Sequence, residues 1–109
     1  MEGRNKILRI CEISPKYRFQ GPRYIELGDA SGQEFREDHL IPWLDSLKNN
    51  EPAIVDFAGT RAYSPSFLDE SFAGAIRENE KNREKLNHVS FINIDPTWHK
   101  KLKEYIQEA

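Results

Sequence analysis

Serines and carboxylates are concentrated between residues 55 and 70, where a short apolar run is followed by a glycine turn and a proline. These polar residues are Asp56, Ser64, Ser66, Asp69 and Glu70. Proline fits the first position of a helix, so the residue before it, Ser64, is expected to be the N-cap of a helix that begins at Pro65. The chemistry open to such a segment is acid–base catalysis, anion binding at the helix start, or modification of a serine.

The helix predicted from Pro65 to about Arg77 has two different faces. At ~100° per residue, one stripe is apolar and is expected to pack on a sheet: Leu68, Phe72, Ala75 and Ile76. The opposite stripe is expected to be exposed: Ser66, Glu70, Ala73 and Arg77. Phe67 and Gly74 lie on the flank between them, where an aromatic side chain beside a glycine suits the anchoring of a partner. We therefore expect a partner-binding surface made of Arg61, Ser66, Phe67, Glu70 and Arg77.

Two other functions compete with partner binding at this segment. An enzyme would use Asp56, Asp69 or Glu70 as acid–base groups, but adjacent carboxylates on a helix point about 100° apart and do not form a dyad. A small-anion or nucleotide binder would use amide donors at the helix start with Arg61 nearby, although the two acids at 69 and 70 oppose an anion there. Partner binding without catalysis is the leading hypothesis, followed by anion binding and then by an enzyme.

Motifs for cofactors and metals are missing from the sequence. There is no Gly-x-x-x-x-Gly-Lys-Ser/Thr loop, no Gly-x-Gly-x-x-Gly and no His-Glu-x-x-His. The single cysteine, Cys11, lies in an apolar run and is expected to be a small buried hydrophobic residue. His39, His88 and His99 are far apart in sequence and are expected at the surface or at sheet edges. We predict neither a cofactor nor a metal site.

Length and composition favour a single domain that spans residues 1–109. The sequence carries 16 Lys and Arg against 18 Asp and Glu, a net charge of −2, which gives no support to a dedicated nucleic-acid binder. No apolar stretch approaches the ~20 residues of a membrane span. The polar segment Met1–Lys6 does not resemble a signal peptide. We therefore expect a cytoplasmic protein without membrane association.

The pattern along the chain predicts a β-β-α-β-α-β-α order. Strands are predicted at residues 7–13, 23–27, 53–57 and 88–94. The first two are expected to be antiparallel neighbours because their link is short, and the third is expected to be central and parallel to a neighbour.

Three helices are predicted between and after these strands. The first follows a Ser31–Glu34 capping box and is expected to kink or divide at Pro42. The second begins at Pro65 and fades into the polar run 78–85, a predicted solvated helix end or mobile loop. The third begins at Asp95–Pro96, with one apolar face: Trp98, Leu102, Tyr105 and Ile106.

Several short motifs together resemble the STAS-like domains of unknown function, which are relatives of the anti-sigma-factor antagonists. The resemblance covers about residues 20–109. The motifs are Gly21-Pro22-Arg23-Tyr24, Ser31-Gly32-Gln33-Glu34-Phe35-Arg36, Leu40-x-Pro42-x-Leu44, Val55-Asp56-Phe57-x-Gly59-Thr60 and Ser66-Phe67-Leu68-Asp69-Glu70-x-Phe72-x-Gly74.

The resemblance implies a small mixed α/β sheet of about four strands, with helices packed mainly on one face. It also implies a regulatory, partner-switching role without turnover. In the antagonists, a serine at the helix start is phosphorylated by a histidine-kinase-like ATPase, so such an ATPase is the expected partner. When the motifs are aligned on Leu68, Pro65 occupies the position of the phosphorylated serine and Ser66 matches the serine after it. Ser66 and Ser64 are therefore the candidate phosphorylation sites.

Overall fold

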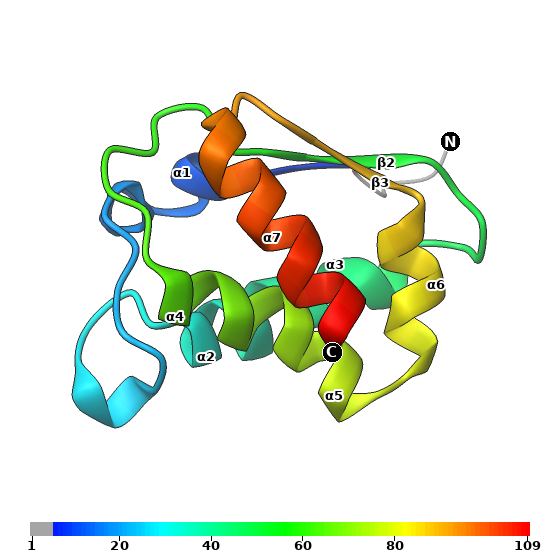
Figure 1. Cartoon of the computed structure of the whole chain (residues 1–109), viewed down its shortest axis with the longest axis horizontal. Helices are drawn as coiled ribbons and strands as arrows, with labels where there is room; N and C mark the ends of the chain where they lie inside the picture. The colour runs from blue at the N-terminus through cyan, green and yellow to red at the C-terminus, as the bar shows by residue number, and fades with distance from the viewer. Residues whose placement is uncertain (1–5) are drawn as a thin grey trace.

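A three-stranded parallel sheet runs along one side of the computed structural model, which describes residues 6–109 (Figure 1). Its strands are β1 (Ile7–Arg9), β2 (Ala53–Asp56) and β3 (Val89–Ile92), in the spatial order β1-β2-β3. The prediction of a central strand near residues 53–57, parallel to its neighbour, is confirmed. Ile7 lies opposite Ile54, and Ala53 lies opposite Val89.

Helical elements make up most of the remaining chain. The α-helices are α1 (Ile10–Ile13), α2 (Gly32–Phe35), α3 (Ile41–Ser46), α4 (Pro65–Leu68), α5 (Gly74–Glu78), α6 (Lys81–Asn87) and α7 (Pro96–Glu108). Two 3₁₀ turns, η1 (Pro15–Arg18) and η2 (Ile25–Leu27), and two π turns, η3 (Arg36–Leu40) and η4 (Asp69–Ala73), complete the order. Each π turn joins the helices on either side of it, so residues 32–46 and 65–78 are two continuous helices.

The predicted second strand at residues 23–27 is wrong, and the predicted antiparallel pair with it. This segment is a loop whose two ends are fastened together: the amide of Gly21 donates to Ala30 O (2.9 Å), and the amide of Gly32 donates to Pro22 O (2.9 Å). A Cβ on Gly21 would lie 2.2 Å from Asp29 O, so only glycine permits this closure. The sheet therefore has three strands in the described residues, all parallel.

The first predicted strand is also too long. Only Ile7–Arg9 pairs with β2, and the chain then turns into α1. Ile10 and Cys11 are buried in that turn of helix, which explains why the segment is apolar throughout. The expectation about the polar segment Met1–Lys6 falls almost wholly outside the described residues.

Pro42 neither divides its helix nor ends it, because a π turn precedes it. The amide of Ile41 donates to the carbonyl of Arg36, five residues back, which widens the helix just before the proline. The second π turn, at η4, has a similar bond from the Gly74 amide to Asp69 O. Nothing in the sequence pattern predicted this second widening.

The polar run 78–85 agrees with the predicted solvated helix end only at Glu78, the exposed last residue of α5. It contains most of a separate short helix, α6, whose Asn82 and Leu86 are buried. The Asn82 side-chain amide donates to the carbonyl of Ala75 at 2.9 Å, which ties α6 to α5.

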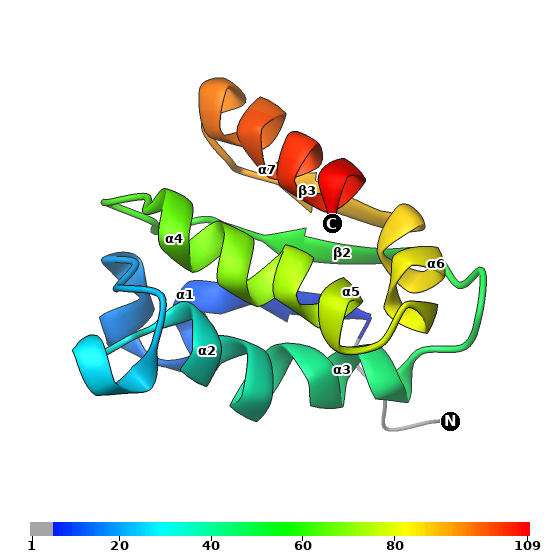
Figure 2. The same ribbon diagram turned by 60° about the horizontal axis from the view of Figure 1, so that its bottom comes forward.

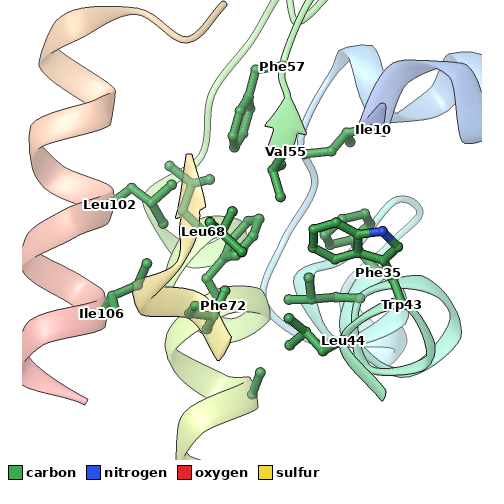
Figure 3. Packing of buried hydrophobic residues seen from close by; sticks show 14 of the residues in the cluster. Ile10, Phe35, Trp43, Leu44, Val55, Phe57, Leu68, Phe72, Leu102 and Ile106 are labelled. Atoms are coloured by element: carbon green, nitrogen blue, oxygen red, sulfur yellow. The ribbon is translucent and has the colours of Figure 1, made fainter. Parts of the chain in front are cut away.

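The core lies between the sheet and the long helices. In Figures 1 and 2 the continuous helices α2–α3 and α4–α5 run side by side, and α7 lies across from them beside β3. Figure 3 shows Phe35, Val55, Phe72 and Leu102 converging from these elements. On β2, Ala53 and Val55 are buried whereas Ile54 and Asp56 are partly exposed, so the two faces of the sheet are covered unequally.

Helix α7 agrees with its prediction. Asp95 caps it by accepting from the amides of Thr97 (2.9 Å) and Trp98 (3.4 Å), and Pro96 occupies the first position. Leu102 and Ile106 are buried and Trp98 and Tyr105 pack beside them, as the spacing predicted.

Candidate functional site at the start of helix α4

The start of α4 lies beyond the carboxyl end of β2, the edge at which open α/β sheets bind their ligands. Ser64 caps the helix as predicted: its Oγ accepts from the amide of Phe67 at 3.2 Å. The amide of Ser64 donates in turn to Oε1 of Gln20 at 2.9 Å. The other side-chain atom of Gln20, Nε2, is buried without a hydrogen-bond partner in the described residues. The helix start is thus held in place from a loop far away in sequence.

Few backbone donors remain at this helix start. Pro65 has no N–H, the amide of Phe67 is taken by the cap, and the amide of Leu68 donates to Ser64 O at 3.1 Å. Within residues 6–109, the Ser66 amide is the one first-turn donor with no acceptor. An anion site at a helix start normally has several converging amides.

Phe67 does not lie at the edge of an exposed face, and that expectation is wrong. Its side chain is 0% exposed and packs against Phe35, with ring centroids 5.4 Å apart. The cause is the close approach of α2: a Cβ on Gly32 would lie 2.7 Å from Phe67 O. Phe67 therefore belongs to the core between the two long helices, where a docking partner does not touch it.

Ala73 and Glu70 also leave the predicted exposed stripe. Ala73 is fully buried because the wide turn η4 shifts the helical phase and because α7 packs against this segment. The Glu70 side chain is only 13% exposed and accepts from Arg36 Nη1 (2.6 Å) and Arg23 Nη1 (3.2 Å). Of the predicted stripe, Arg77 is exposed and Ser66 is half-buried.

Arg36 joins the two π turns directly. Its Nη1 donates both to the Glu70 carboxylate and to the Glu70 carbonyl (2.8 Å), and its Nε donates to Glu78 at 3.2 Å. Gly74 makes space for the guanidinium, since a Cβ there would lie 2.9 Å from Nη1. Sequence reasoning missed this contact because it joins the second helix to a residue more than thirty positions earlier.

Asp69 is held by two arginines. It accepts from Arg23 Nη1 at 2.8 Å and from Arg77 Nη2 at 3.1 Å. Partial burial alone would raise the pKa of this carboxyl, but the hydrogen bonds from Arg23 and then Arg77 outweigh it and leave the pKa below its ordinary value. A carboxylate held ionised by two cations is a poor general acid.

Asp56 occupies a separate place. Its Oδ1 accepts from the amide of Ala58 (2.8 Å) and from Asn93 Nδ2 (2.9 Å), which connects the ends of β2 and β3. The structure gives no contact between Asp56 and either of the other two acids. Asp69 and Glu70 share the donor Arg23 Nη1 and therefore lie close together, so Asp56 is the one of the three carboxylates proposed for an enzyme that lies apart.

An exposed apolar loop lies beside the helix start. The sequence pattern predicts a strand at residues 23–27 and therefore does not indicate this loop. Four large side chains of this loop are exposed: Phe19, Tyr24, Ile25 and Leu27. Phe19 forms a bridge with Ala62, and the amide of Arg61 donates to Arg18 O at 2.7 Å, so this loop and the 57–64 loop are fastened together. The signal that could have revealed it is the short stretch with Tyr24, Ile25 and Leu27 that has glycines close on both sides.

The remaining candidate residues are scattered. Cys11 is buried, with its Sγ 3.6 Å from Thr60 Oγ1. His39 packs against Tyr17, His88 lies beside Glu84, and His99 lies beside Phe91. Across residues 6–109, no group of three His, Cys, Asp or Glu side chains is arranged to hold a metal ion. None of the helices in that range is long and apolar enough to cross a membrane.

Comparison with known proteins gives one match. The model of a family described as a STAS-like domain of unknown function matches residues 31–98, which include both π turns, the α4 start and β3. No significant match is found among curated proteins or among solved structures.

Proposed function

Because this chain belongs to the family of STAS-like domains of unknown function, we propose that it is a non-catalytic regulatory module that binds a protein partner. The proposed binding surface is the exposed side of the α4 start, with Arg61, Ser66 and Arg77, extended by the apolar loop that carries Phe19. Phe67 and Glu70 are not part of this surface. Phe67 lies in the core, and Glu70 forms ion pairs with Arg36 and Arg23.

The observation that carries this proposal is the exposure of large apolar side chains beside the helix start. Phe19 is 58% exposed although its backbone is fixed by the bridge to Ala62. Exposed apolar residues on an ordered surface, next to a cation such as Arg61 that has no ion-pair partner within residues 6–109, are typical of protein interfaces.

The competing functions find less support. The carboxylate of Asp56 lies apart, and those of Asp69 and Glu70 are both bound by arginine side chains, which disfavours acid–base catalysis. One free amide at the helix start disfavours a small-anion or nucleotide site. We therefore keep the expected partner, a histidine-kinase-like ATPase, as the first protein to test.

The test is an isothermal titration with the histidine-kinase-like ATPase domain encoded nearest to this protein's gene. Wild-type protein is expected to bind, and Arg61→Glu is expected to bind about tenfold more weakly, because a rim cation becomes a carboxylate. Lys100→Glu, with the same charge change at an exposed position on α7, serves as the matched control and is expected to bind like wild type. Absence of binding, or an equal loss in both variants, would reject this surface and partner.

Phosphorylation of Ser66 is the regulation proposed for this surface. Ser66 is half-buried with no side-chain partner among the described residues, whereas Ser64 is engaged as the cap. A phosphate adds about −2 charge beside Asp69 and therefore acts outward on a docked partner. In the same titration, Ser66→Glu is expected to weaken binding by about 1–2 kcal/mol and Ser66→Ala to leave it unchanged; equal affinities would exclude this switch.

A further inference from the structure

A cavity of about 540 Å³ is lined by residues of α6, β3 and α7. In Figure 1, α6 lies at the opposite side of the molecule from the α4 start. Its apolar floor is formed by Leu86, Val89, Phe91 and Ile106. This volume lies within the range of ordinary ligand sites, ~300–1,000 Å³.

The rim of the cavity is cationic. Arg83 and Lys103 line it, together with His99, and no carboxylate is among its lining residues in the described chain. Arg83 is partly neutralised by Glu80 and also donates to the carbonyl of Ile106 at 3.2 Å. Lys103 is exposed and has no ion-pair partner within residues 6–109, so it supplies the uncompensated charge.

The floor includes the unpaired outer edge of the sheet. Strand β3 is an edge strand. The carbonyl of His88, just before it, accepts from the amide of Ala53 (3.1 Å), and the carbonyl of Ile92 accepts from the amide of Phe57 (3.0 Å), just after the central strand. Because successive residues of a strand direct their backbone groups to opposite sides, the N–H and C=O groups of Val89 and Phe91 point away from β2. In the described part of the chain, no other strand pairs with them.

We propose that this groove binds an extended peptide segment with acidic side chains, which adds a fourth strand along the outer edge of β3. The free backbone groups of Val89 and Phe91 would form the main-chain hydrogen bonds. Alternate side chains of the peptide would enter the cavity, where Lys103 favours carboxylates. A small organic anion would use the cavity but would leave these backbone groups unpaired. The inference is independent of the proposed function, which uses another surface.

The test uses fluorescence anisotropy with a labelled heptapeptide that alternates valine and glutamate. Two matched probes accompany it: one with lysine in place of glutamate, and one with alternate backbone nitrogens methylated. The acidic peptide is expected to bind, and both matched probes are expected to bind at least about tenfold more weakly, since one has the wrong charge and the other cannot pair as a strand. Equal binding of the methylated peptide would overturn strand addition in favour of a side-chain pocket.

Two protein variants locate the site. Lys103→Glu is expected to weaken binding of the acidic peptide about tenfold. Lys100→Glu carries the same charge change on the same helix but does not line the cavity, and it is expected to leave binding unchanged. Failure of the acidic peptide to bind wild-type protein, or equal losses in the two variants, overturns the proposal. Arg61→Glu is expected to leave peptide binding intact, so this result and that of the ATPase titration are separable.

Discussion

Arg36 and Glu70 form the best-protected ion pair between the two long helices. Their side chains are 12% and 13% exposed, and the guanidinium also binds the Glu70 carbonyl. Removal of one member of a buried pair costs more than loss of a surface pair, because the remaining charge stays desolvated.

Glu70→Ala is therefore expected to lower the free energy of unfolding by about 3 kcal/mol. Arg77→Ala removes an exposed partner of Asp69 and is expected to cost no more than about 1 kcal/mol. Urea denaturation followed by circular dichroism measures both. Similar losses in the two variants would contradict the view that the Arg36–Glu70 pair is structural.

The two serines at the helix start are predicted to differ in the same assay. Ser64→Ala removes the hydroxyl that accepts from the Phe67 amide and is expected to cost about 1 kcal/mol. Ser66→Ala removes no hydrogen bond of the described residues and is expected to change stability by less than about 0.5 kcal/mol. A larger cost at Ser66 than at Ser64 would reverse the assignment of the cap.

Acid is expected to destabilise the protein through its arginine- and lysine-bound carboxylates. The hydrogen bond from Lys16, helped by that from Tyr17, lowers the pKa of Glu34, and the pKa of Asp69 is lowered as well. A carboxyl whose pKa is lower in the folded state contributes stability above its unfolded value of about 4, and this contribution is lost as pH falls through the folded value.

Asp69→Asn is the variant that isolates one of these contributions. The free energy of unfolding of the wild type should fall from pH 5 to pH 3, and the variant should fall less steeply because one linked proton is missing. Urea midpoints at a series of pH values provide the measurement. Parallel curves would mean that Asp69 has the same pKa in the folded and unfolded chain.

At the scale of elements, the two long helices approach closely at a glycine. The Cβ of an alanine at position 32 would lie 2.7 Å from Phe67 O and 3.0 Å from the Glu70 Cβ, both rigid parts of the opposite helix. Position 74 differs, since its nearest neighbour is the end of the Arg36 side chain.

Gly32→Ala is therefore expected to destabilise the protein by about 1–3 kcal/mol, although alanine generally favours helix over glycine. Gly74→Ala is the comparison and is expected to cost less, because a side-chain end can shift. Thermal unfolding of both variants decides the matter. A stabilised Gly32→Ala protein would show that the helices can separate without cost.

Local signals predicted the elements that are capped or fully buried. Ser64–Pro65 and Asp95–Pro96 fix their helix starts by side-chain hydrogen bonds within three residues, and the apolar run 53–57 became the central strand. The false strand at 23–27 has the same alternation as a true one. What distinguishes it is the loop closure at Gly21, a contact with Ala30 that the local pattern does not contain.

The candidate site was predicted only in outline for a related reason. The position of the helix start follows from the Ser64–Pro65 cap signal, and the exposure of Arg77 follows from helical periodicity. The burial of Phe67 and Glu70 depends on a second helix that supplies Gly32 and Arg36, and on a π turn that shifts the helical phase. The periodic pattern of one helix carries no information about such contacts with a second helix.

At the scale of the whole molecule, one core joins the three strands and the seven α-helices of the described residues, so a single cooperative transition is expected. The two tryptophans provide separate reporters: Trp43 lies on α3, and Trp98 stacks on Tyr63 from α7. Fluorescence of the Trp43→Phe and Trp98→Phe variants should each follow the same urea curve as the circular dichroism of that variant. Separated midpoints within one variant would indicate that α7 unfolds independently.

The strand order has a consequence for how the chain is made. A ribosome releases β1 first, β2 next and β3 last, and β2 is the middle strand of the sheet. The middle strand is therefore released before one of its two neighbours. The helices between residues 32 and 78 can form while the sheet still lacks β3, because non-local strand pairing is slow compared with helix formation. During that interval the nascent chain presents Ala53–Asp56 with one side unpaired, and this is the stage at which it is most exposed to mispairing with another chain or to capture by a chaperone.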